Sequence, residues 1–193
     1  MSTRGYALVT AAYWVFTLSD GALRMLVLLH FHALGYTPLT LATLFLLYEV
    51  CGVVTNLLGG WVGSRYGLKC TLHAGLLLQV IALVLLAQLG SDATLAFSVA
   101  WVMGVQALSG VAKDLTKMSA KSSVKLLADG VDPAERHART FLWVAVLTGS
   151  KNALKGAGFV LGGALLATIG FSGAIAAMAL ALFCVWLFSM VAL

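Results

Sequence analysis

Charged residues are scarce in this sequence of 193 residues. Asp, Glu, Lys and Arg together make up 10% of the chain, whereas soluble domains average about 25%. Hydrophobic residues make up 61%. The longest polar stretch, from about Lys117 to Arg139, is interpreted as a loop and not as a domain. These proportions exclude a soluble globular protein and indicate an integral membrane protein.

Cysteine is also rare, and Cys51, Cys70 and Cys184 stand apart among apolar neighbours. They form neither a metal-ligand spacing nor a disulfide pattern, so we interpret them as small buried hydrophobic residues. The predicted helices carry no metal cluster and no nucleophile–base pair, which argues against an enzyme and predicts no metal and no cofactor. The net charge of +5 is assigned largely to loops that set membrane orientation and not to nucleic-acid binding.

Six apolar segments account for nearly the whole chain, and each is long enough to cross a bilayer, which takes about 20 residues. The predicted helices span residues 6–32, 39–62, 70–90, 94–118, 139–168 and 171–192. Gly35 to Pro38 separates the first two, and Gly170 is expected to form the tight turn between the last two. The predicted fold class is an all-α integral membrane protein with six transmembrane helices.

The basic residues outside these segments are confined to alternate connections. They are Arg4, Arg65, Lys69, Lys121, Lys125, Arg136 and Arg139. The other three connections contain no Lys or Arg. Because Lys and Arg accumulate in cytoplasmic loops, we predict that both termini face the cytoplasm and that the protein is a multi-pass component of the cell (inner) membrane.

Ionisable residues inside the helices are the most informative feature of the chain. The first helix carries Asp20 and Arg24, the second Glu49, the fourth Lys113, Asp114 and Lys117, and the fifth Lys151 and Lys155. A charge at the bilayer centre costs roughly 2.5–3.5 kcal/mol on insertion scales, so it is rare unless it faces a cavity or a partner. The pattern predicts a bundle with a polar interior, in which four helices line a solute pathway and the third and sixth face lipid.

Two of these groups have more than one interpretation. Asp20 and Arg24 lie one helical turn apart, so they form either a self-contained ion pair or a polar face on the cavity. Lys113 and Asp114 lie deep in their helix and are candidates for function, and Asp114 is also placed to pair with Lys117. The later lysines of that helix, from Lys117 onward, are expected at the membrane interface.

The sharpest signal is the pair Lys151 and Lys155, which share one helical face near mid-bilayer with no acid in the same helix. The alternative is pairing with Glu49 or Asp20 of another helix. Across the helices five cations face three acids, so full pairing still leaves positive charge that a bound anion would compensate. Nearby glycines at 149, 156, 158, 162 and 163 permit close approach of a helix or a ligand.

Two patterns resemble the major facilitator superfamily. Leu58-Gly59-Gly60 recurs as Leu161-Gly162-Gly163, as an inverted three-plus-three repeat would give. Residues 60–69 resemble the loop signature of that superfamily, in which the matching positions are Gly60, Arg65, Gly67 and Lys69. Ser64 and Leu68 replace its acid and one of its cations. The resemblance implies a conformational latch, and the alternative is a basic turn that only fixes topology.

Three longer stretches resemble the organoarsenical efflux permeases of the ArsJ type. They are AYW at 12–14 with TLSDGALRMLVLLHFH at 17–32, ALSGVAKDLTKMSAK at 107–121, and LTGSKNALKG at 147–156. The resemblance implies export of 1-arseno-3-phosphoglycerate, which a glyceraldehyde-3-phosphate dehydrogenase partner makes from arsenate, and therefore arsenate resistance. That family has twelve helices, so the chain resembles an amino-terminal half that works with a second six-helix half, either a missing carboxy-terminal region or another chain.

The residues are assigned expected roles on this basis. Arg24, Lys113, Lys151 and Lys155 are predicted to bind the anionic substrate. Asp20, Glu49 and Asp114 are predicted to serve proton coupling or ion pairing, because they are the only acids in the helices. The alternatives are a carrier for another organic anion, a sugar phosphate or a drug, and, in a different class, a membrane assembly protein that transports nothing.

Overall fold

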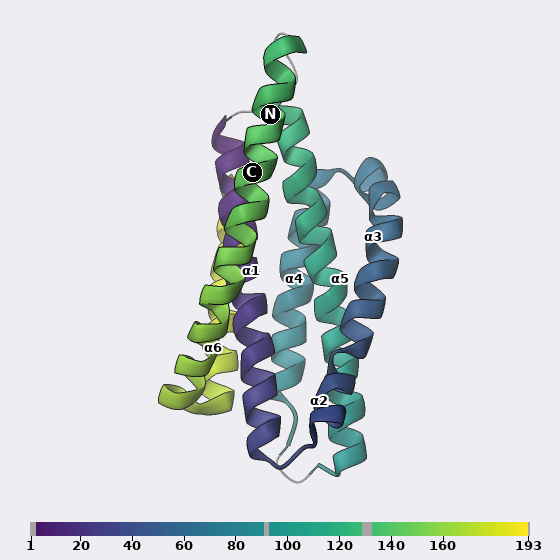
Figure 1. The fold of residues 1–193 in the computed structure, drawn as a ribbon, viewed down its shortest axis with the longest axis vertical. Coiled ribbons are helices and arrows are strands. Elements are labelled where there is room, and N and C mark those ends of the chain that lie inside the picture. The colour runs from purple at the N-terminus through teal and green to yellow at the C-terminus, as the bar shows by residue number, and fades with distance from the viewer. Residues whose placement is uncertain (1–2, 91–92, 129–132, 193) are drawn as a thin grey trace.

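The computed structural model describes residues 3–90, 93–128 and 133–192, and their side chains over 5–90, 93–123 and 140–192. Over these residues the regular structure is helical (Figure 1). The helices are α1 (Thr3–Ala33), α2 (Pro38–Leu44), α3 (Leu46–Tyr66), α4 (Leu68–Ala87), α5 (Leu95–Ala128) and α6 (Pro133–Ala192). They run mostly along one long axis, with the chain ends near the same end of the bundle.

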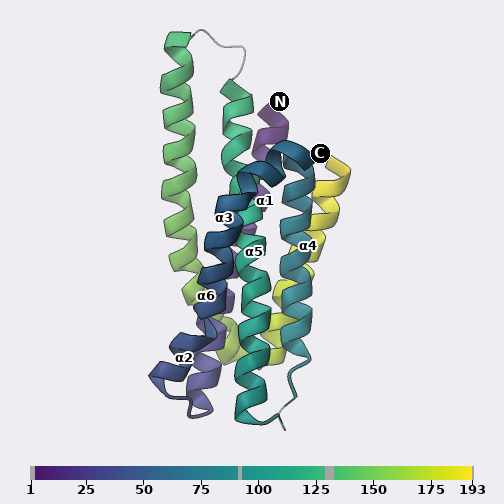
Figure 2. The ribbon, with the colours of Figure 1, turned by 90° about the vertical axis from the view of Figure 1, so that its right-hand side faces the viewer.

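Five stretches within the described residues are long and apolar enough to cross a membrane, and they indicate a multi-pass membrane protein. They are Gly5–Ala33, Pro38–Tyr66, Leu68–Ala87, Leu95–Ser123 and Thr140–Ala192. The last is interrupted at Gly170, whose φ of 71° and ψ of −178° are not helical. Glycine adopts positive φ at little cost, and the chain reverses direction there, so the two parts of α6 run antiparallel (Figure 2).

Several predicted helices differ from the structure in their limits. The segment expected as one helix over 39–62 is divided into α2 and α3 at Phe45, and α2 begins with Pro38 after the N-cap Thr37, whose side chain accepts from the Thr40 amide. These are favoured residues for a helix start. The polar stretch after residue 118, expected as a loop, instead extends α5 to Ala128.

That extension has a local cause, because Ala, Lys and Leu have high helix propensity and a polar sequence does not by itself end a helix. The predicted membrane orientation depends in part on the basic residues of this region. Lys125, Arg136 and Arg139 lie outside the residues whose side chains the structure describes. Lys121, one turn before Lys125, is described and is exposed.

Glycines allow the helices that carry charge to pack closely. A Cβ atom added to Gly158 of α6 would overlap the carbonyl oxygen of Leu18 in α1, and one added to Gly162 would overlap the backbone of Ala22. A Cβ atom at Gly110 of α5 would likewise overlap the backbone of Tyr48 in α3. Small residues at such contacts let membrane helices approach backbone to backbone.

The third predicted helix, expected to face lipid, corresponds to α4. One side of α4 buries Leu72, Leu76 and Leu83 against its neighbours behind α1 and α5 in Figure 1, and its other side exposes Leu77, Ile81 and Val84. Cys70 and Cys184, expected to be buried, are exposed on the bundle surface. In a membrane protein the outside is as apolar as the core, so apolar sequence neighbours do not imply burial.

Candidate functional site

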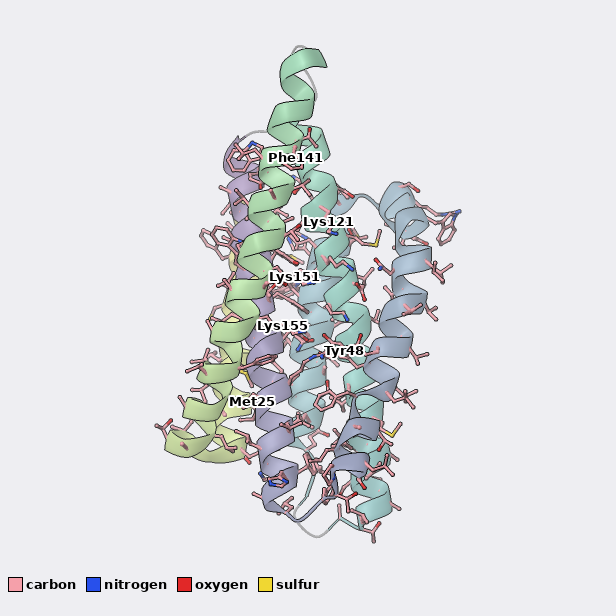
Figure 3. The ribbon with its side chains drawn as sticks, in the orientation of Figure 1. Met25, Tyr48, Lys121, Phe141, Lys151 and Lys155 are labelled. Carbon is pink, nitrogen blue, oxygen red and sulfur yellow. The ribbon has the colours of Figure 1, made fainter. Side chains whose placement is uncertain are left out.

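A cavity of about 200 Å³ gathers most of the charged residues of the helices. It is lined by Tyr13, Phe16, Thr17, Asp20 and Arg24 of α1, Glu49 of α3, Lys113 and Lys117 of α5, and Lys151 and Lys155 of α6. Figure 3 shows Lys151 and Lys155 on α6 and Tyr48 on α3 near the middle of the long axis, with Lys121 nearer the end that holds the chain termini. Of the residues predicted to bind substrate or to serve proton coupling, Asp114 does not line the cavity, but it contacts two residues that do.

Glu49 joins three helices through its carboxylate. Its Oε1 lies 2.6 Å from Nη2 of Arg24 on α1, and its Oε2 lies 3.7 Å from Nζ of Lys113 on α5. Among the described residues, the ion pair that Arg24 makes is this one. The self-contained pair with Asp20, which was one interpretation of the sequence, is therefore not the arrangement found. Arg24 reaches across to α3 and not along its own helix.

Asp114 is almost fully buried and holds two lysines of its own helix. Its Oδ1 lies 3.0 Å from Nζ of Lys117, which is the pairing the sequence allowed, and its Oδ2 lies 3.7 Å from Nζ of Lys113. Lys117 also lies 3.5 Å from Oδ1 of Asn56. Lys117 therefore lines the cavity, together with the residues that were predicted to be functional. The polar partners on α3 and α5 hold it inside the bundle.

Tyr48 is a part of the site that the sequence analysis missed. Its side chain is fully buried, and its hydroxyl donates a hydrogen bond to Oδ1 of Asp20 at 2.7 Å. The centre of its ring lies 4.0 Å from Cζ of Arg24 and 4.2 Å from Nζ of Lys113, within the range of cation–π attraction. In the sequence, its position next to Glu49 is a sign of this role. However, an aromatic residue in an apolar helix more often indicates ordinary packing.

Lys151 and Lys155 differ from the other cations of the cavity. Within the part of the chain that the structure describes, neither ammonium group has a carboxylate at ion-pair distance. The proposed partners are held elsewhere, Glu49 by Arg24 and Asp20 by Tyr48. Asp20 and Glu49 still lie near enough to interact electrostatically with Lys155.

The backbone of α6 beside the two lysines is partly open. A Cβ atom added to Gly149 or Gly156 would meet no atom within 4 Å, whereas Gly158 and Gly162 are in tight contact with α1. Of the glycines predicted to permit close approach, some therefore pack against α1 and others border free space. One turn of α6 is fixed against α1, because Nε1 of Trp14 donates to Oγ of Ser150 at 2.9 Å.

The charges of the site divide into a balanced group and a surplus. The balanced group is three cations, Arg24, Lys113 and Lys117, and three acids: Glu49 and Asp114 form ion pairs with these cations, and Asp20 accepts from Tyr48. The surplus is Lys151 and Lys155, so the cavity carries two net positive charges when every group is ionised. Unpaired charge away from water is costly, and a small anion of charge near −2 would offset it. In the described residues no group of three or more His, Cys, Asp or Glu is arranged to hold a metal ion.

The loop residues of the predicted signature do not line this cavity; they lie at the end of α3 and the start of α4, where the two helices join (Figure 1). Gly67 has φ of 81° and donates its amide to the Gly63 carbonyl at 3.1 Å, which ends α3. Cζ of Arg65 lies 5.5 Å from the ring centre of Trp61. Ser64, at the position of the acid, hydrogen-bonds within α3 to the Trp61 carbonyl. Gly60 borders open space, and Lys69 lies in the first turn of α4.

Comparison of the sequence with protein-family models and with curated proteins finds no match.

Proposed function

We propose that this chain is the amino-terminal half of a major facilitator exporter for a small, multiply charged organic anion. In this proposal α6 crosses the inner membrane twice, on either side of Gly170, which gives six crossings and two cytoplasmic termini. The reversal at Gly170 and the position of the chain ends at one end of the bundle support this topology. The repeated Leu-Gly-Gly supports the three-plus-three organisation of such a half.

The unpaired cations Lys151 and Lys155 carry the functional part of the proposal. They line a cavity at mid-height in a bundle of apolar helices, and the nearby carboxylates are held by other groups. Lysine is a compact, strongly hydrated cation that suits phosphate as a point charge. The cavity therefore favours an anion that carries phosphate or a similar oxyanion over a neutral or cationic solute.

The cargo we propose is 1-arseno-3-phosphoglycerate, which a glyceraldehyde-3-phosphate dehydrogenase supplies. The exported ester then breaks down to arsenate outside the cell. The cavity charge supports the anionic class, and the arsenic itself rests on the sequence resemblance. A carrier for a sugar phosphate or another organic anion would use the same lysines. Glu49 is 58% exposed although it forms an ion pair, which agrees with a site that a second six-helix half completes.

The test is arsenate tolerance in cells without arsenate efflux of their own. The complete transporter, this chain with its second half, is expressed with and without the dehydrogenase. We expect higher tolerance and lower cellular arsenic only when both are present. Tolerance without the dehydrogenase would point to export of arsenate itself. If both cultures retain arsenic equally but lose a sugar phosphate, the cargo is an ordinary phosphorylated metabolite.

A further inference from the structure

Tyr48 stands at the point where the balanced charges of the cavity meet. Its hydroxyl holds Asp20 of α1 at 2.7 Å, and its ring lies against Arg24 and Lys113. Both of these cations also contact Glu49. One buried side chain of α3 thus touches a carboxylate and two cations from two other helices, which no ordinary packing residue needs to do.

The ring has little freedom to leave this place. Tyr48 is 0% exposed, and its backbone is pressed against α5 at Gly110, where even a methyl group would overlap its carbonyl. Its hydroxyl needs a partner because an unsatisfied buried hydroxyl is costly. The fold therefore delivers this hydroxyl to Asp20, which is only 4% exposed.

Asp20 is the cavity carboxylate whose position bears on Lys155. It lines the same cavity as Lys151 and Lys155, and it interacts electrostatically with Lys155 without reaching ion-pair distance. If its Oδ1 were released from Tyr48, Lys155 would be available to pair with it, because it lines the same cavity and has no carboxylate at ion-pair distance among the described residues. Such a pair would remove one of the two charges that an anion needs.

We propose that Tyr48 is a positioning residue of the anion site, which keeps Asp20 away from Lys155 and so preserves the surplus positive charge of the cavity. This inference rests on the proposed function, because it assumes that the surplus charge binds an anion. It assigns Tyr48 a role in affinity, exerted through a second residue, and not a contact with the cargo.

The test is calorimetric binding of 3-phosphoglycerate to the complete transporter, this chain with its second half, in lipid nanodiscs, with glycerol as the uncharged control. Tyr48→Phe keeps the ring and removes only the hydroxyl. Loss of this hydrogen bond to the charged Asp20 would free the carboxylate to pair with Lys155. Because the site then has less positive charge, we expect the affinity for 3-phosphoglycerate to fall about tenfold. Tyr36→Phe, which removes a hydroxyl at a site packed on Phe31, is the matched control and should bind as the native chain does.

The decisive comparison uses Asp20→Asn, which has no negative charge to place on a lysine. Tyr48→Phe combined with Asp20→Asn should bind within about twofold of Asp20→Asn alone, as a coupled pair requires. An unchanged affinity in Tyr48→Phe overturns the role of Tyr48. So does a tenfold loss that persists in the Asp20→Asn background, because the loss would then come from a loosened fold. A native complete transporter that binds no 3-phosphoglycerate contradicts the proposed function and this inference with it.

Discussion

Arg24 of α1 and Glu49 of α3 form an ion pair in which Nη2 and Oε1 lie 2.6 Å apart, although the two residues are 25 positions apart in the chain. Arg24 is one turn from Asp20 on its own helix, yet Asp20 accepts a hydrogen bond from Tyr48. The carboxylates of the cavity are thereby distributed among partners on α1, α3 and α5. Among the side chains that the structure describes, the two lysines of α6 are left without a carboxylate at ion-pair distance.

Exchanging the two charges tests the Arg24–Glu49 pair. Arg24→Glu alone leaves two acids facing each other and should lower the melting temperature and the amount of protein in the membrane, since breaking a buried pair costs about 3–5 kcal/mol. The half-exposed position of Glu49 reduces that figure toward the lower values of surface pairs. Adding Glu49→Arg should recover most of the loss. Recovery is measured by thermal unfolding in detergent, and its absence would show that the pair contributes no stability.

Removing the ammonium group of Lys151 should abolish efflux while the protein remains in the membrane at native levels. Lys151→Ala takes away one of two surplus charges, so arsenate tolerance and arsenic export by the complete transporter should be lost. Lys121→Ala, an exposed lysine outside the cavity, is the matched control and should export normally. If the double change Lys151→Ala with Glu49→Ala restores transport, Lys151 is the partner of Glu49 and not a ligand for the anion.

The α1–α6 contact should be sensitive to one methyl group. Gly158→Ala places a Cβ atom where the Leu18 carbonyl already lies, and overpacking of this kind costs typically about 1–3 kcal/mol. Gly104→Ala introduces the same methyl group into open space on α5 and should gain up to about 1 kcal/mol from helix propensity. Circular dichroism melts of the two variants should move in opposite directions. A common direction would mean that α1 and α6 do not pack through Gly158.

The proposed orientation is tested with single cysteines in a chain without native cysteines. A cysteine at Thr37, between α1 and α2, should react with an impermeant maleimide added to intact cells. One at Ser64, near the turn between α3 and α4, should react only after the membrane is opened. The physical basis is the preference of Lys and Arg for cytoplasmic loops. Labelling of Ser64 from outside would reverse the topology.

Much of the helical architecture was predictable because it depends on neighbours in the sequence. Apolar runs of the length of a bilayer predicted the membrane helices, and Gly170 predicted the reversal in α6. Lys151 and Lys155 were recognised as a pair without an acid in their helix, because residues four apart share a face. The break at Phe45 and the length of α5 were missed, since no strong helix breaker marks the first and good helix formers continue through the second.

The partners within the cavity were not predictable in the same way. The sequence by itself determined which helices carry charge, which charges share a helical face, and that cations outnumber acids. Only the tertiary structure decided that Arg24 pairs with Glu49, that Lys117 turns inward, and that Tyr48 holds Asp20. The physical reason is that helix periodicity fixes neighbours within a helix, whereas contacts between helices depend on the rotation and height of each helix, which close packing at Gly158 and Gly110 sets.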